Sequence, residues 1–120
     1  MEKNIRKRVF IDLDDTMCDF SGAHRKALEN EPGIQWPQSQ FDFFRTLDPM
    51  PGAIDSFKKL EEHYEVHILS RPSADNLMCF TEKAVWVRDH LGQNVLSEQR
   101  FHLSGRKDYF AELGDAVLID

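Results

Sequence analysis

The stretch VFIDLDDTMCDF, residues 9–20, decides the fold because it joins an apolar run to a cluster of carboxylates. Residues 9–11 are the short β-branched and aromatic run that is typical of a buried strand. Asp12, Asp14 and Asp15 follow within four positions. Carboxylates this close repel one another unless positive charge lies among them. The rest of the chain is therefore expected to supply that charge at the end of the strand.

Strand and helix patterns alternate along the remaining sequence. Apolar segments predict strands at residues 8–13, 64–70, 100–104 and 116–120. Helical patterns cover residues 22–31, a segment opened by Pro51 and Gly52, and a segment from Asn76 to Leu91. The predicted apolar faces of the last two helices are Ile54, Phe57 and Leu60, and Leu77, Phe80, Ala84, Val87 and Leu91. This order predicts an α/β fold, a Rossmann-like parallel sheet of about four strands with helices on both faces.

A small insert is expected after the first strand. Residues 34–50 are rich in proline and aromatic residues, and Trp36, Phe41, Phe43 and Phe44 need burial. We therefore expect a short, structured cap at about residues 18–50. The length of 120 residues suits a single domain over residues 1–120.

Composition excludes several classes of partner. The net charge of −6 argues against a nucleic acid duplex as ligand. No apolar stretch is long enough to cross a membrane, and the N-terminus lacks a signal-peptide pattern. Cys18 and Cys79 are too few for a disulfide framework and are interpreted as reduced, buried residues of a cytoplasmic protein.

Chemically capable side chains follow the predicted strands. Ligands of parallel sheets bind beyond the carboxyl ends of the strands. Paired carboxylates there can hold Mg²⁺, and an aspartate can also attack phosphorus as a nucleophile while a neighbour transfers protons. A hydroxyl and a lysine can stabilise a transferring phosphoryl group. The residues at the four strand ends are Asp12 and Asp14, then Ser70 and Arg71, then Lys107, then Asp120.

These positions resemble the motifs of a known superfamily. FIDLDDT (residues 10–16) is similar to the D-x-D-x-T motif of the haloacid dehalogenase superfamily of phosphohydrolases, and Ser70, Lys107 and GDAVLID (114–120) suit its other three motifs. Nearly the whole chain resembles the 5'(3')-deoxyribonucleotidase family in spacing and residue type. The segments that carry this resemblance are DFFRTLDPMPGAIDSF (42–57), EVHILSRPS (65–73), TEKAVWVRDHLG (81–92) and GDAVLID.

The resemblance implies a Mg²⁺-dependent hydrolase of nucleoside monophosphates that forms an aspartyl-phosphate. Asp12 would be the nucleophile, and Asp14 would be the acid, then the base, and lend its backbone carbonyl to the metal. Asp120 would be a further metal ligand. Ser70 and Lys107 would bind the phosphoryl group, and Arg71 would bind it either through its side chain or through its N–H alone. Asp15 is interpreted as a turn or capping residue. The residues placed near the base pocket are Phe20, Phe43 and Phe44.

Departures from the family pattern leave alternatives open. The family has a second acidic residue and more chain after the position of Asp120, so the C-terminal part of the fold is expected to be missing and Mg²⁺ binding to be weakened. A phosphatase for another small phosphomonoester, or a catalytically impaired nucleotide-binding relative, remains open, as does a homodimer. A receiver-like regulatory module is disfavoured because residues 41–60 lack an apolar run that ends in a phosphoacceptor aspartate.

Overall fold

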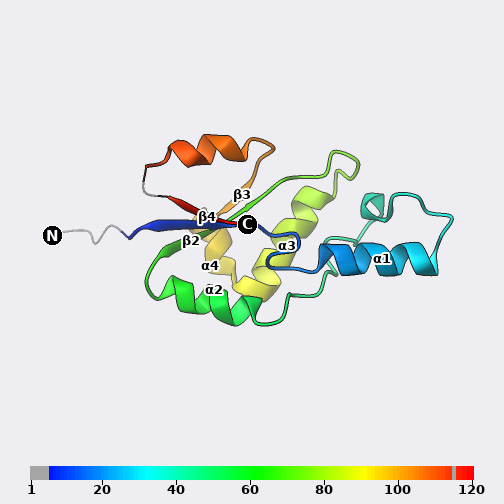
Figure 1. The fold of residues 1–120 in the computed structure, drawn as a ribbon, viewed down its shortest axis with the longest axis horizontal. Helices are drawn as coiled ribbons and strands as arrows, with labels where there is room; N and C mark the ends of the chain where they lie inside the picture. The colour runs from blue at the N-terminus through cyan, green and yellow to red at the C-terminus, as the bar shows by residue number, and fades with distance from the viewer. Residues whose placement is uncertain (1–5, 115) are drawn as a thin grey trace.

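A four-stranded parallel sheet organises the chain in the computed structural model, which describes residues 6–114 and 116–120. Asp115 of the fourth motif lies outside the described residues. The strands are β1 (Arg8–Ile11), β2 (Glu65–Ser70), β3 (Phe101–Leu103) and β4 (Val117–Ile119), in the order β3-β2-β1-β4. All four carboxyl ends therefore meet at one edge, beside the insert (Figure 1).

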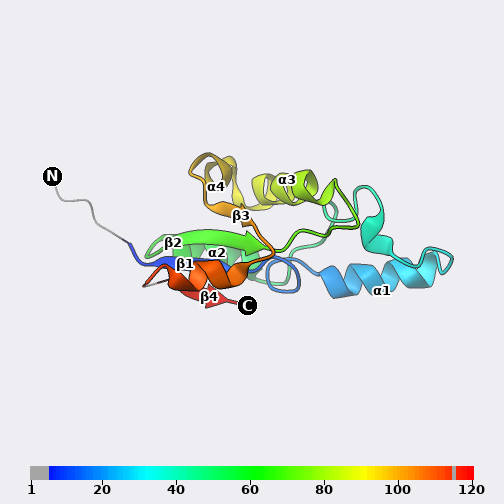
Figure 2. The same cartoon turned by 90° about the horizontal axis from the view of Figure 1, so that it is seen from above.

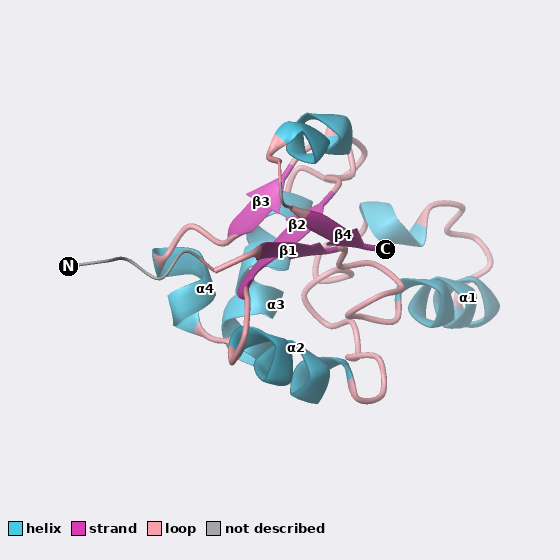
Figure 3. Cartoon of the chain, turned by 60° about the vertical axis from the view of Figure 1, so that its left-hand side comes forward, coloured by secondary structure: helices cyan, strands magenta, loops and turns pink. Residues whose placement is uncertain are grey.

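Helical segments cover both faces of the sheet. The helices α2 (Ala53–Glu61), α3 (Cys79–Leu91) and α4 (Gln93–Ser97) lie on one side, and the 3₁₀ helix η2 (Lys107–Glu112) lies on the other (Figure 3). Right-handed crossovers explain this split. The chain crosses the sheet in one direction from β1 through β2 to β3 and in the opposite direction from β3 to β4. The connections of the two directions therefore pack on opposite faces. The predicted α/β fold is confirmed. In the described part of the chain, no helix is both long and apolar enough to cross a membrane.

The core lies between the sheet and the face formed by α2 and α3. Val66 and Ile68 of β2 are fully buried and pack in one cluster with Phe57 of α2 and Val87 of α3. Helix α2 begins after Gly52, whose φ of 78° is in the left-handed region that favours glycine. The predicted apolar face of this helix is confirmed, since Phe57 is fully buried and its neighbours on that face pack against the cluster.

Replacing Phe57 with alanine should lower the free energy of unfolding by about 3–5 kcal/mol, because the ring is fully buried and its loss leaves a cavity. Urea unfolding followed by circular dichroism measures this change. Phe41→Ala is the matched control, since the Phe41 side chain is 79% exposed and should contribute within about 0.5 kcal/mol. Equal losses in the two variants would contradict the assignment of the core.

The start and the buried face of α3 differ from the prediction. The helix begins at Cys79 instead of Asn76, and Leu77 and Phe80 are 83% and 46% exposed. Val87 and Leu91 of the predicted face are buried, but two charged residues also lie on the inner face because each finds polar partners there. The residues that α3 buries are Cys79, Glu82, Lys83, Trp86, Val87 and Leu91.

Residues 18–50 leave the sheet after β1 and return before α2. They hold α1 (Phe20–Asn30), which projects beyond the edge of the sheet, and the short 3₁₀ helix η1 (Pro37–Ser39) (Figures 1 and 2). The two ends of the segment are joined by backbone hydrogen bonds, from Asp19 N to Asp48 O at 2.8 Å and from Met50 N to Met17 O at 2.8 Å. The insert is thereby fixed to the sheet at its base.

The aromatic residues of the insert are not all buried. Phe44 is 3% exposed, as expected, but Trp36 and Phe41 are 56% and 79% exposed, so their predicted burial is wrong. One α-helix and one short 3₁₀ turn offer too little apolar surface to cover four large rings. The insert buries Phe44 and leaves Trp36 and Phe41 at the surface.

Candidate active site

The carboxyl edge of the sheet gathers the predicted residues. Asp12 follows β1 directly, and its backbone N–H donates to Ile119 O at 2.9 Å. This bond extends the pairing of β1 with β4 and brings Asp12 beside Asp120. Ser70 ends the neighbouring strand β2 and is 1% exposed. Parallel register thus carries three separate segments of the sequence to one place.

Asp12 is paired with a lysine from the η2 side of the sheet. Its Oδ1 atom accepts a hydrogen bond from the backbone N–H of Leu13 at 2.8 Å and lies 2.9 Å from Lys107 Nζ. The side chains of Asp12 and Lys107 are 18% and 20% exposed. An ion pair so largely withdrawn from solvent is screened less by salt than a surface pair. Lys107 reaches this position as the first residue of η2.

Asp14 is paired with a second lysine, which the sequence patterns did not identify. The Nζ atom of Lys83, on α3, donates to Asp14 Oδ2 at 3.1 Å, to Ser70 Oγ at 2.8 Å and to the Arg71 carbonyl at 2.7 Å. The Lys83 side chain is 1% exposed. A buried ammonium group needs polar partners, and these three acceptors match its three N–H donors. Lys83 is therefore a buried cation in contact with Asp14 and Ser70.

The two lysines explain how Asp12 and Asp14 can lie so close together. Each carboxylate has its own cation, and the cations approach from opposite faces of the sheet, Lys107 from η2 and Lys83 from α3. The only sequence signal for Lys83 is its spacing, four residues after Cys79 and three before Trp86, which places it on the side of α3 that those two residues bury. A lysine is rarely buried without a partner, and the partner of Lys83 becomes visible only in the fold.

Asp120 adds a third carboxylate to this edge. A hydrogen bond with Asp12, and the negative charge of that residue, raise the pKa of the Asp120 carboxyl above its ordinary value, while Lys107 acts in the opposite direction. Among the described residues, no group of three or more carboxylate, histidine or cysteine side chains is arranged to hold a metal ion. The carboxylate of Asp14 contacts Lys83 and Cys18, so the side-chain oxygens that face each other are those of Asp12 and Asp120.

Asp15 has the structural role that the sequence suggests. Its backbone φ of 62° lies in the left-handed region, and its carboxylate accepts hydrogen bonds from Ser21 N at 2.8 Å and Ser21 Oγ at 2.5 Å. Aspartate tolerates this conformation better than most residues and is common in turns. The interpretation of Asp15 as a turn residue at the start of α1 is confirmed.

Cys18 lies beside the site as a protonated, buried thiol. Burial, reinforced by the charge of Asp14, raises the pKa of Cys18 far above its ordinary range. The thiol donates weakly to Leu13 O at 3.4 Å and to Asp14 Oδ1 at 3.6 Å. Cys79 is also buried and free. The Cys18 thiol therefore lacks the lowered pKa of a nucleophilic cysteine, and both thiols lack the exposure of one.

The three predicted pocket residues form one aromatic cluster. Ring centroids lie 5.5 Å apart for Phe20 and Phe43, 6.0 Å for Phe20 and Phe44, and 5.3 Å for Phe43 and Phe44. Lys83 Nζ lies 4.9 Å from the centroid of the Phe44 ring. The cluster therefore adjoins the Lys83 ammonium, and its rings join the insert to the sheet edge.

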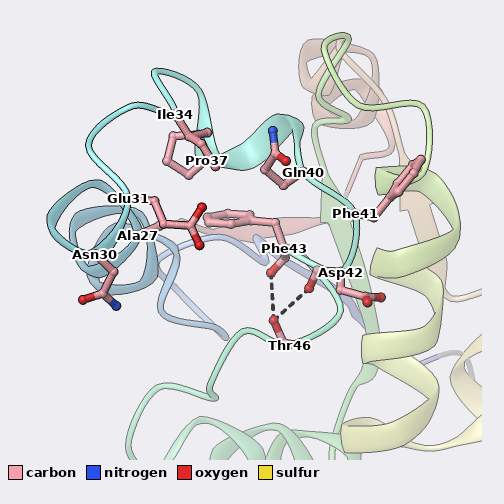
Figure 4. A pocket seen from close by; sticks show the side chains of 10 residues that line it. All are labelled: Ala27, Asn30, Glu31, Ile34, Pro37, Gln40, Phe41, Asp42, Phe43 and Thr46. Atoms are coloured by element: carbon pink, nitrogen blue, oxygen red, sulfur yellow. Dashed lines mark hydrogen bonds between the residues drawn. The ribbon is translucent and has the colours of Figure 1, made fainter.

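Phe43 also borders a cavity on the far side of this cluster. The cavity, of about 330 Å³, lies between α1 and the loop that follows η1, and the Phe43 ring points into it toward Ala27 and Glu31 (Figure 4). Thr46 Oγ1 donates to the carbonyls of Asp42 and Phe43, which stiffens this side of the loop. One face of the loop thus borders an open cavity, while Phe44 packs inward.

Arg71 contributes its backbone to the site. Its carbonyl accepts from Lys83, whereas the residue itself is exposed to solvent. Of the predicted residues, the structure brings together Asp12, Asp14, Ser70, Lys107 and Asp120, with the backbone of Arg71, and it adds Lys83.

Comparison with known proteins identifies relatives of this chain, although no family model matches it. The mitochondrial 5'(3')-deoxyribonucleotidase of Mus musculus is 27% identical and matches 76% of this chain. The cytosolic type from Homo sapiens is 26% identical, over 94% of this chain and 70% of its own length. A relative from Vibrio phage KVP40 that carries the same family name is 30% identical over 103 residues, or 78% of this chain. The chain spans 56% of the length of both the phage and the mouse relatives.

Solved structures support the same assignment of the fold. The class C acid phosphatase from Bacillus anthracis superposes with a TM-score of 0.67 at 18% identity, covering 90% of this chain and 46% of that enzyme. At this identity the likeness concerns the fold alone. Together, the deoxyribonucleotidase relatives and this fold support a 5'-nucleotidase-like family of the haloacid dehalogenase type for the chain.

Proposed function

We propose that the protein is a phosphomonoester hydrolase, and more specifically a 5'(3')-deoxyribonucleotidase that acts through an aspartyl-phosphate on Asp12. The observation that carries this proposal is the pairing of both D-x-D carboxylates with their own lysines, beside the buried Ser70 hydroxyl. Positioned cations and a hydroxyl around a carboxylate are what phosphoryl transfer to that carboxylate requires.

In the first step, a carboxylate oxygen of Asp12 attacks the phosphorus and the ester P–O bond breaks. The proton on the Asp14 carboxyl passes to the leaving oxygen, so that a neutral alcohol departs. Lys107, 2.9 Å from Asp12, and Lys83, 2.8 Å from Ser70, place positive charge around the transferring group. Their charge stabilises the transition state, in which negative charge is spread over the phosphoryl oxygens.

In the second step, Asp14 takes a proton from a water molecule that attacks the phosphorus of the aspartyl-phosphate. The P–O bond to Asp12 breaks, inorganic phosphate leaves, and Asp12 recovers its carboxylate. Lys83 holds the Asp14 carboxylate at 3.1 Å, so the same group is in position for both proton transfers.

The residues present fit a divalent cation. Asp12 and Asp120 lie so close that a hydrogen bond between their side chains, and then their like charges, raise the pKa of Asp120, and hard oxygen donors of this kind suit Mg²⁺. We propose that Asp12 and Asp120 hold the ion through their side chains and Asp14 through its backbone carbonyl. When bound, the ion would neutralise charge on the phosphate and on these carboxylates.

The substrate class follows from the aromatic cluster together with the family. Phe20, Phe43 and Phe44 lie next to the Lys83 ammonium, and aromatic rings favour contact with a planar base. We propose a deoxynucleoside monophosphate whose phosphate lies among Asp12, Ser70 and the two lysines and whose base contacts these rings.

The experiment is phosphate release from a panel of nucleoside monophosphates, p-nitrophenyl phosphate and glycerol 2-phosphate, with and without Mg²⁺. Mg²⁺-dependent release that is fastest with deoxynucleoside monophosphates would support the proposal. Similar rates with all substrates would indicate a general phosphatase. No release from any substrate would indicate a catalytically impaired relative and would overturn the proposed activity.

A further inference from the structure

The loop that carries Phe43 and Phe44 is held to the rest of the protein by side chains from α3 and the turn before it. Asn76 Nδ2 donates to the carbonyls of Gln38 and Gln40 at 3.1 and 3.2 Å. Trp86 Nε1 donates to the Leu47 carbonyl at 2.7 Å. These buried anchors fix the two ends of the segment that runs from η1 to Leu47, in which the residues after η1 form only bends and turns.

Glu82 anchors the middle of this loop. The residue is 4% exposed, and its carboxylate accepts backbone hydrogen bonds from Asp42 N to Oε2 at 2.9 Å and from Phe44 N and Arg45 N to Oε1 at 3.1 and 3.4 Å. A buried carboxylate without donors would be costly, so these N–H groups and the carboxylate depend on each other. Phe43 and Phe44 lie within the segment that Glu82 holds.

Glu82 is adjacent in sequence to Lys83, and the two side chains contact different parts of the site. Lys83 contacts Asp14 and Ser70, where the phosphoryl group is proposed to lie, whereas Glu82 contacts only the loop backbone in the bonds described here. Both residues belong to one rigid helix. The distance from the phosphoryl end to the aromatic rings is therefore set by two consecutive residues of α3.

We propose that Glu82 is a positioning residue for substrate specificity. It fixes Phe43 and Phe44 relative to the phosphoryl end of the site. Phosphate esters whose own ring can contact Phe43 and Phe44 then bind preferentially. The inference rests on the proposed function, because it takes the phosphate to lie against Asp14, Ser70 and Lys83. It concerns selectivity, since none of the groups that would hold the phosphate is bonded to Glu82.

The test is Glu82→Gln, measured by calorimetry without Mg²⁺, so that the nucleotide is not hydrolysed, with deoxythymidine 5'-monophosphate and with inorganic phosphate. A glutamine has a single acceptor oxygen, so it can keep the bond from Asp42 or those from Phe44 and Arg45, but not both sets. We expect the Kd for the nucleotide to rise by about tenfold or more and the Kd for phosphate to change by less than about threefold. Hydrogen exchange of the Asp42, Phe44 and Arg45 amides should become faster.

The matched control is Glu61→Gln, at the far end of α2. Glu61 pairs with Arg100 at 3.0 Å, next to the amino end of β3 and away from the carboxyl edge. This variant should leave both Kd values and the exchange of the three loop amides unchanged. Thermal unfolding of both variants establishes that they are folded under the conditions of the binding measurement.

The outcomes separate this inference from the proposed function. Equal weakening of nucleotide and phosphate in Glu82→Gln, or no change in either, would overturn the specificity role. If the unsubstituted chain binds both ligands but releases no phosphate from any ester, the proposed activity fails while the ratio of the two Kd values still decides the role of Glu82. If it binds neither ligand, both proposals fail.

Discussion

Asp12→Asn should reduce the kcat for phosphate release by about 10³-fold or more, because an amide cannot serve as the nucleophile that forms the aspartyl-phosphate. The substitution is nearly isosteric. The asparagine oxygen can still accept from the Leu13 N–H and from Lys107, which lie 2.8 and 2.9 Å from Oδ1 in the unsubstituted protein. The fold and the position of Lys107 should therefore persist, and the loss should be confined to chemistry. Steady-state phosphate release at saturating substrate and Mg²⁺ measures it.

Asp15→Asn is the matched control for this prediction. Asp15 belongs to the same cluster of carboxylates in the sequence, but its side chain bonds to Ser21 in a turn and not to the site. Its kcat should stay within about threefold of the unsubstituted protein. A kcat for Asp12→Asn within about tenfold of the unsubstituted value would contradict the role of Asp12 as nucleophile.

The parts of the fold that follow from local pattern were predictable. All four strands lie within the predicted segments, since each is a short apolar run bounded by polar residues, and their parallel arrangement follows from the alternation with helices. The gathering of Asp12, Ser70 and Asp120 at one edge follows from the same topology, because parallel strands bring their carboxyl ends together.

Hydrophobicity predicted only part of the buried face of α3, namely Val87 and Leu91. Glu82 and Lys83 are buried because partners distant in sequence satisfy them, the loop at residues 42–45 for Glu82 and Asp14 with Ser70 for Lys83. Charge patterns in a sequence do not show which charges will be paired inside. The prediction therefore took Leu77 and Phe80 as core residues, and both are exposed.

The exposure of Trp36 and Phe41 has a different cause. Large aromatic residues are usually buried, but only when the surrounding segment has enough apolar surface to cover them. The insert consists of α1, η1 and turns, and its contact with the sheet edge is taken up by Phe44 and Leu47, each 3% exposed. The composition of a segment predicts that its aromatic side chains tend to be buried. The size of the folded insert determines which of them are buried.

Lys83→Met should reduce kcat by about 10²-fold or more, a loss of the size seen when one donor to the charge of a transition state is removed. Lys83 supplies the buried cation that contacts Asp14 and Ser70, and the thioether of methionine fills a similar volume without charge. Removing one partner of a buried ion pair is strongly destabilising when the charge that remains is also buried. Asp14 is 29% exposed, so water can solvate its carboxylate once the lysine is gone. We therefore expect a large loss of kcat in Lys83→Met with only a small change in the free energy of unfolding.

Lys59→Met provides the comparison that separates this role from a general effect of removing a lysine. Lys59 lies exposed on α2, so this variant should keep kcat within about twofold of the unsubstituted protein. The prediction for Lys83 also differs from that for Glu82. Loss of Lys83 should lower kcat on every phosphate ester, including glycerol 2-phosphate, because all of them place the same phosphoryl group against Asp14 and Ser70. A loss in Lys83→Met confined to nucleotides would contradict that placement. It would instead assign Lys83 to the aromatic cluster, where the Phe44 ring centroid lies 4.9 Å from the Lys83 ammonium.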